Sequence, residues 1–280
     1  MTRPDYKVTE EPIEEEPDED WEHRELYDRV KEALFALPSY FNSEIFLEGI
    51  QAEDVFALNS VLAPAVEDTV VETLNSMRSV WDADDEYSDC SFVRQSQTFP
   101  DVVLVRHIGQ GKKEPIMGIE LKNWYLLSKE EEPSARFKTT VDACAKQDLL
   151  AVFTWSLDNV ITGSPVLYEP YVTSAIRASN YVDYYWQTTR NTDLDTTIER
   201  PEGITPYPSS KSDEIHDDPV SDSGNNYGRL ARSRIPDFDN YKEKMLNKKL
   251  SGIRAEEWIE FLKTNGRDEQ TEIIDFDMEN

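Results

Sequence analysis

Two carboxylates and a lysine lie at positions where the sequence predicts buried strands. Glu120 and Lys122 are two residues apart in the apolar stretch 116–127, so on a strand their side chains would project to the same face, about 6.6 Å apart. Asp101 comes directly before a second apolar run, residues 102–105. Burying a charged group on such a strand costs free energy unless the charge is paired or takes part in binding or catalysis. Two carboxylates can hold a divalent cation while a lysine positions and helps to deprotonate water, which is the equipment for phosphodiester hydrolysis.

The surrounding sequence predicts the elements that would position these groups. Residues 61–81 carry an apolar stripe at helical spacing, and Glu67 lies at the edge of that stripe. Three antiparallel strands are expected next, over residues 91–95, 102–105 and 116–127. A helix over 139–148 and a returning strand over 149–155 follow. This order of helix, strands, helix and strand predicts an α/β sandwich.

A short motif adds a family resemblance. Phe99-Pro100-Asp101, followed after 18 residues by Glu120-Leu121-Lys122, resembles the Pro-Asp and Glu-x-Lys signature of the PD-(D/E)XK nuclease superfamily, which includes restriction endonucleases. The order of expected elements over residues 60–155 is similar too. The resemblance implies a restriction-endonuclease-like core, in which a mixed central β-sheet is flanked by helices.

The resemblance also implies roles for individual residues. Asp101 and Glu120 would bind Mg²⁺ with the backbone carbonyl of Leu121, and Lys122 would orient the attacking water. Glu67 would match a helix acid that contacts the metal through water in some members. The alternative for the first set is an ordinary salt bridge on an exposed edge strand. For Glu67 the alternative is a solvated helix edge.

The composition of the chain divides it into four zones. Residues 1–20 are rich in Glu, Asp and Pro, which predicts a disordered acidic arm. Residues 21–190 would form the nuclease core with its N-terminal helices, beginning with a helix over 21–37. Residues 191–236 are rich in Pro, Ser, Asp and Gly and are typical of a linker or long loop. Residues 237–280 would form a C-terminal helical segment, interrupted near Ser251-Gly252.

The charge of the chain argues against ordinary DNA binding. It has 29 basic and 57 acidic residues, a net charge of -28 and a pI near 4.4, so its long-range field repels a polyanion. The acids run through the whole sequence, which favours a salt-adapted, halophilic surface over a local mimic of DNA. No apolar run reaches the roughly 18 residues of a membrane helix, so we expect a soluble, cytoplasmic protein without a membrane partner.

Two groups of basic residues are candidates for DNA contact. Arg136 and Lys138 follow the motif strand on an expected loop, and an arginine cluster comes later in the chain, with members Arg229, Arg232 and Arg234. Alternatively, these cations belong to an ordinary surface loop or pair with the protein's own acids.

Together these features predict an Mg²⁺-dependent DNA endonuclease, of restriction or host-defence type. One such site cuts one strand, so a duplex break suggests a homodimer. The alternatives are a repair or recombination nuclease such as a junction resolvase, and a non-catalytic acidic interaction protein on a nuclease-like fold.

Overall fold

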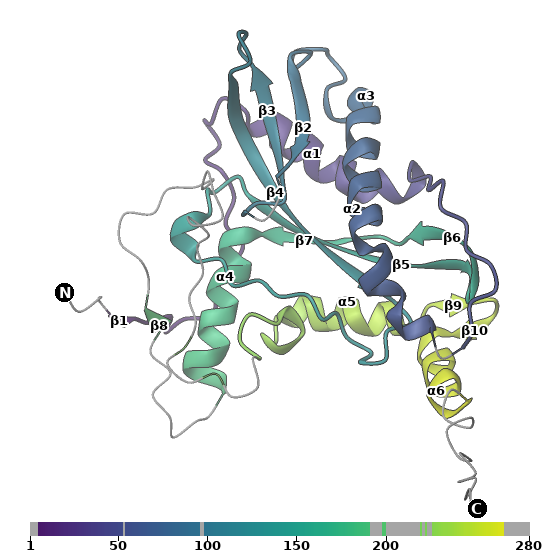
Figure 1. Ribbon diagram of the computed structural model, residues 1–280. Coiled ribbons are helices and arrows are strands. Elements are labelled where there is room, and N and C mark those ends of the chain that lie inside the picture. The colour runs from purple at the N-terminus through teal and green to yellow at the C-terminus, as the bar shows by residue number, and fades with distance from the viewer. Residues whose placement is uncertain are drawn as a thin grey trace, which may run out of the picture.

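A computed structural model of the protein describes residues 5–52, 54–95, 98–190, 198–199, 219, 222 and 226–265. The α-helices in these ranges are α1 (Arg24–Ala36), α2 (Leu58–Ser76), α3 (Arg78–Trp81), α4 (Ala175–Tyr184), α5 (Pro236–Leu246) and α6 (Ala255–Asn265). The strands are β1 (Asp5–Tyr6), β2 (Cys90–Arg94), β3 (Val102–His107), β4 (Lys113–Tyr125), β5 (Leu149–Asn159), β6 (Thr162–Leu167), β7 (Tyr171–Ser174), β8 (Ile198–Glu199), β9 (Lys249–Leu250) and β10 (Ile253–Arg254). A mixed sheet flanked by helices confirms the predicted α/β class (Figure 1).

The central sheet has the strand order β2-β3-β4-β5-β6, with β7 also paired to β5. Strands β2, β3 and β4 are successive antiparallel neighbours, as the sequence predicts. β4 and β5 run parallel, with Glu120 opposite Leu150 and Lys122 opposite Val152. The far edge of β5 is shared by two strands, because β7 pairs with its first residues and β6 with its last ones. β4 therefore lies inside the sheet, with β3 on one side and β5 on the other.

Helices cover the two faces of the sheet through adjacent residues of β4. Asn123 donates a hydrogen bond to the carbonyl of Ala63 in α2, at 3.3 Å. The neighbouring Trp124 packs against the ring of Tyr241 in α5, with centroids 6.5 Å apart. Successive residues of a strand point to opposite faces, so α2 and α5 lie on opposite sides of β4. Figure 1 shows α2 crossing the sheet and α5 running below it.

The connection between β4 and β5 differs from the expectation. The sequence predicts a helix over residues 139–148, but this segment has only a single 3₁₀ turn, Val141–Ala143. Its backbone carbonyls find partners outside the segment: the carbonyl of Thr139 accepts from the hydroxyl of Ser179 in α4, and the carbonyl of Asp148 accepts the N–H of Ala175 at 2.9 Å. The β-branched run Thr139-Thr140-Val141 also has low helix propensity, so tertiary partners decide the conformation.

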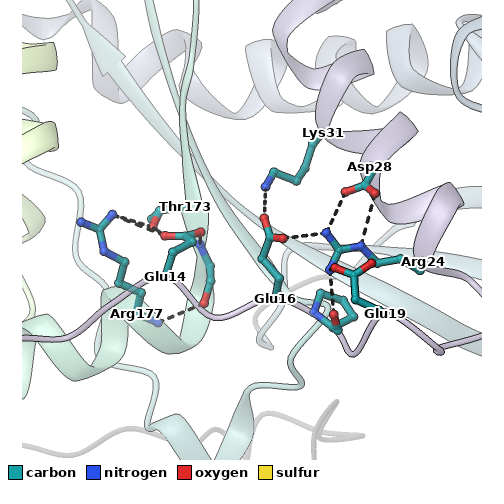
Figure 2. A network of polar contacts seen from close by, with 10 residues as sticks. Glu14, Glu16, Glu19, Arg24, Asp28, Lys31, Thr173 and Arg177 are labelled. Carbon is teal, nitrogen blue, oxygen red and sulfur yellow. Dashed lines mark hydrogen bonds and ion pairs between the residues drawn. The ribbon is translucent and has the colours of Figure 1, made fainter.

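The N-terminal arm makes defined contacts where the structure describes it. Residues 7–18 form no helix or strand, yet the carboxylate of Glu14 accepts from Thr173 Oγ1 at 2.7 Å and from Ser174 N–H at 2.6 Å. The carboxylate of Glu16 bonds Arg24 at 2.6 Å and Lys31 at 2.7 Å, both on α1. Figure 2 shows the carboxylate of Glu14 beside Thr173 and Arg177, the latter on α4, and the carboxylate of Glu16 beside Lys31 and Arg24. The acids of this segment thus contact both α4 and α1.

The described part of the C-terminal segment, up to residue 265, is mostly helical and packs onto the core. The predicted interruption at Ser251-Gly252 is the turn between β9 and β10, where both residues have positive φ angles. In α5, the hydroxyl of Tyr241 bonds Thr154 of β5 at 2.7 Å, and Asp237 forms an ion pair with Arg177 at 2.7 Å. Most of the expected linker 191–236, and all of the segment beyond 265, lie outside the described residues. In the described part of the chain, no helix has both the length and the apolar composition needed to cross a bilayer.

Candidate active site

The site lies where β3 stops and β4 continues. β3 begins at Val102, opposite Ile119, so β4 residues from Glu120 onward have no β3 partner on that side. The side chain of Asp101 supplies the missing hydrogen-bond partner: its Oδ2 atom accepts the N–H of Leu121 at 2.9 Å. The N–H of Asp101 donates to Oε2 of Glu120 at 3.1 Å. The end of a strand pair therefore brings the two predicted carboxylates together.

A glycine lets the preceding proline approach β4 closely. A Cβ atom at Gly118 would lie 2.4 Å from Cγ of Pro100 and 2.8 Å from Oδ1 of Asp148, closer than real contacts allow. The N–H of Gly118 also donates to this Asp148 oxygen at 2.8 Å. The absence of a side chain at position 118 thus allows Pro100 to pack against β4 and fixes the chain just before Asp101.

Lys122 completes the predicted set. Its ammonium hydrogen-bonds Oε1 of Glu120 and lies 3.6 Å from Oδ2 of Asp101. The exposed fraction of the side chain is 10% for Glu120, 17% for Lys122 and 30% for Asp101. The three groups form a largely buried ion cluster and not the exposed surface pair that was the alternative interpretation.

Burial sets the protonation behaviour of this cluster. Burial raises the pKa of Glu120 to about 7; the charge of Lys122 opposes this shift and that of Asp101 adds to it. For Lys122, burial on its own would lower the pKa, but the charges of Glu120 and Asp101 outweigh it and the pKa is raised. The ammonium therefore stays charged at neutral pH, which suits it to hold and stabilise charge better than to act as a general base.

Glu67 lies beside this cluster, on α2. Its Oε2 atom pairs with Arg94 of β2 at 3.0 Å, and its Oε1 atom accepts from Nδ2 of Asn123 at 3.3 Å. Burial and then the charge of Asp101 raise the pKa of Glu67, against the opposing charges of Arg94 and Lys122. Three sides of the site thus contribute: α2, the end of β2, and β4.

Sequence reasoning missed Arg94, Asn123 and Asp68. Arg94 also pairs with Asp68 at 2.5 Å, one residue after Glu67 on α2. One signal was available for Asn123, because a third polar residue directly after Lys122 interrupts an apolar strand and requires a bonding partner. No comparable signal marks Arg94, whose partners are 26 and 27 residues earlier in the chain.

The donor chemistry of the site fits Mg²⁺, which prefers carboxylate and carbonyl oxygens. The described residues contain no group of three or more Asp, Glu, His or Cys side chains arranged to hold a metal ion. A cation here would rest on Asp101 and Glu120, with the carbonyl of Leu121 and water as further ligands. The local charge also favours a bound cation. Four carboxylates lie among two basic side chains, which leaves a formal excess of two negative charges. The six groups are Glu67, Asp68, Asp101, Glu120, Arg94 and Lys122.

Three of the predicted basic residues lie on two paired segments, one of which packs against Phe99, two positions before Asp101. Arg136 and Arg229 form an isolated antiparallel bridge, so two segments distant in sequence are adjacent. Phe137, between Arg136 and Lys138, is buried and packs against Phe99 with ring centroids 6.0 Å apart. We call the residues Arg136, Lys138 and Arg229 the basic ribbon. The segment of the ribbon that contains Phe137 is thus joined to the chain just before Asp101 through the contact with Phe99.

The other two predicted cations differ from each other. Arg232 forms an ion pair with Glu132 at 2.7 Å, which matches the alternative that these arginines pair with the protein's own acids. Arg234 is exposed just before α5 and has a positive φ angle. Of the five basic residues proposed for DNA contact, three therefore form the basic ribbon.

No protein-family model matches the chain, and no curated protein matches its sequence.

Proposed function

We propose that the protein is an Mg²⁺-dependent DNA endonuclease, most simply of restriction or host-defence type, with a restriction-endonuclease-like core. One observation carries the proposal: the cluster of Asp101, Glu120 and Lys122 at the point where β3 ends and β4 continues. The order of α2, the antiparallel strands β2 to β4 and the parallel strand β5 supports it. The missing helix between β4 and β5 is the main departure from the resemblance.

The residues of the cluster suit the hydrolysis of a phosphodiester. Asp101 and Glu120 would hold the cation, which when bound supplies charge neutralisation and a more acidic water. Lys122 remains protonated between the two carboxylates, so it would orient the attacking water and stabilise negative charge that develops on the phosphate. The basic ribbon would hold the DNA backbone beside the site through phosphate contacts. A duplex break requires two such sites, so we propose a homodimer as the active form.

The net charge of -28 favours a second candidate, a non-catalytic interaction protein that uses an acidic surface. A plasmid-nicking assay with and without Mg²⁺ separates the two. Supercoiled, linear and four-way-junction DNA should be compared, because preference for the junction would indicate a recombination nuclease. Cleavage that depends on both Mg²⁺ and Asp101 supports the proposal. Absence of cleavage on all three substrates at every salt concentration would favour the interaction protein.

A further inference from the structure

Asn123 joins α2 to the strand that carries Glu120 and Lys122. Its side chain is almost fully buried, with 9% of the residue exposed. The amide nitrogen donates to the carbonyl of Ala63 and to Oε1 of Glu67, both at 3.3 Å. Ala63 and Glu67 are one helical turn apart, so a single amide contacts both the backbone and a carboxylate of the same turn.

Glu67 needs such a contact because its surroundings oppose its charge. The side chain is three-quarters buried, and the nearby carboxylate of Asp101 repels it. Arg94 holds one oxygen of Glu67, and Asn123 holds the other. Arg94 is 38% exposed and also bonds Asp68, so its position is shared with a second acid. The buried amide of Asn123 is the contact that joins Glu67 directly to β4.

We propose that Asn123 is a positioning residue for the cation site: it holds Glu67 of α2 close to Asp101, so that Glu67 can contact, through water, the cation that Asp101 and Glu120 would bind. This inference rests on the proposed function. The Pro-Asp and Glu-x-Lys motif does not imply this role for Asn123, and neither does the presence of Glu67 on α2. Groups that orient a metal ligand from behind typically contribute about 10- to 100-fold in metal affinity.

Asn75 provides a matched control. It is also on α2 and also joins this helix to the sheet, because its side chain donates to the carbonyl of Phe92 and accepts the N–H of Phe92, both at 2.9 Å. It bonds no carboxylate in these contacts. Asn75→Ala should therefore loosen α2 on the sheet at least as much as Asn123→Ala does, without changing a bond to Glu67.

The experiment measures Mn²⁺ binding to the full-length protein by calorimetry in high KCl, which screens unspecific binding to the acidic surface. Asp101→Asn defines the baseline for site-specific binding. The variants are Asn123→Ala, Asn75→Ala, Glu67→Gln and the double variant of Asn123→Ala with Glu67→Gln. Thermal melting of each variant reports its stability separately.

We expect Asn123→Ala to weaken Mn²⁺ binding by about 10-fold or more. Asn75→Ala should lower the melting temperature but leave the Mn²⁺ affinity within about two-fold, since it does not touch the carboxylates. In the Glu67→Gln background, Asn123→Ala should cause little further loss, because both changes act on the same contact.

Three results would overturn the inference while leaving the proposed function intact: unchanged Mn²⁺ affinity in Asn123→Ala, an equal loss in Asn75→Ala, or a full additional loss in the double variant. A different result would remove the proposed function itself. If the wild-type protein shows no Mn²⁺ binding beyond that of Asp101→Asn, the cation site is absent and the role of Asn123 is refuted with it.

Discussion

The backbone N–H of Asp101 donates to Oε2 of Glu120 at 3.1 Å, although the two residues are 19 positions apart. The bond forms because the antiparallel register of β3 and β4 ends one residue earlier, at the pair Val102 and Ile119. Beyond that pair, side chains replace backbone partners. A local loss of strand pairing therefore leaves two carboxylates together at one strand end.

Replacement of Asp101 by asparagine should separate chemistry from folding. Asparagine keeps an oxygen that can accept the N–H of Leu121, so the free energy of unfolding should change by less than about 1 kcal/mol. The negative charge is lost, and the rate of plasmid nicking should fall by at least about 100-fold. Removal of a group that only orients a metal ligand costs up to about 100-fold in activity, and removal of the ligand's own charge should cost at least as much.

Glu114→Gln is the control for this prediction. Glu114 lies on the same strand, β4, but at its exposed opposite end, so the substitution removes one negative charge far from the cluster. It should leave nicking unchanged. Nicking by Asp101→Asn at the rate of Glu114→Gln would show that the site has been assigned wrongly.

Replacement of Lys122 by methionine should affect the rate more than cation binding. Methionine keeps most of the side-chain volume in this buried position but removes the ammonium that pairs with Glu120 and Asp101. Without this competing cation, Mn²⁺ affinity should be retained. The single-turnover cleavage rate should fall by about 100- to 1,000-fold, because the water and the developing charge lose their partner. Parallel losses of affinity and rate would indicate a structural lysine.

The acidic arm should make the protein sensitive to acid. Hydrogen bonds from Lys31 and Arg24 lower the pKa of Glu16 from its ordinary value of 4.5 (Figure 2). The unfolded chain binds this proton more readily than the folded chain does. The stabilisation is therefore present above pH 4.5 and is lost as the pH falls through the lower, folded-state pKa.

Urea unfolding at a series of pH values tests this sign. Between about pH 5 and pH 3, the wild type should lose more stability than Glu16→Gln, whose amide does not titrate. Glu10→Gln, which changes an exposed acid of the same arm, should follow the wild type. Identical pH dependence in all three proteins would show that the contacts of Glu16 do not stabilise the fold.

Elements with a strong local pattern could be predicted from the sequence. The strands around Asp101 and Glu120 are continuous apolar runs, and alternation along β4 correctly places Glu120 and Lys122 on one face. The segment 139–148 could not be predicted in this way, because its partners come from α4 and from distant backbone. The side-chain amide of Gln147, for example, donates to the carbonyl of Ile116, 31 positions earlier.

The candidate site shows the same division. The motif identifies the residues that meet at the strand end, since Asp101 directly precedes β3 and Glu120 and Lys122 lie on the adjacent strand β4. Arg94 and Asn123 enter the site through the packing of α2 on the sheet, which depends on side chains far apart in sequence. Similarly, the basic ribbon requires the bridge between Arg136 and Arg229, which no local pattern of residues indicates.

The basic ribbon should contribute to DNA binding without sequence preference. Each cation that contacts a phosphate releases counterions, so Arg136→Ala should lower the affinity for all duplexes similarly and reduce the slope of log affinity against log salt by about 0.9. Measurements should use the Asp101→Asn background, in which cleavage is suppressed. Arg254→Ala is the control, because Arg254 is paired with Glu256 and Glu257 at the start of α6. If Arg136→Ala and Arg254→Ala lower the DNA affinity equally, the loss comes from the change in net charge and not from a phosphate contact of the basic ribbon.

The net charge of -28 should give the protein an unusual response to salt. At about 0.01 M ionic strength the Debye length is roughly 30 Å, so acids over the whole surface repel one another and repel DNA. Added KCl screens both repulsions, although it also weakens the contacts of the basic ribbon with phosphate. Because acids greatly outnumber cations, the first effect should dominate at low salt. Melting temperature and nicking rate, measured across a KCl series at fixed Mg²⁺, should therefore both rise before any decline. A fall in both from the lowest salt upward would contradict the salt-adapted interpretation and would favour a protein whose acidic surface serves a partner other than DNA.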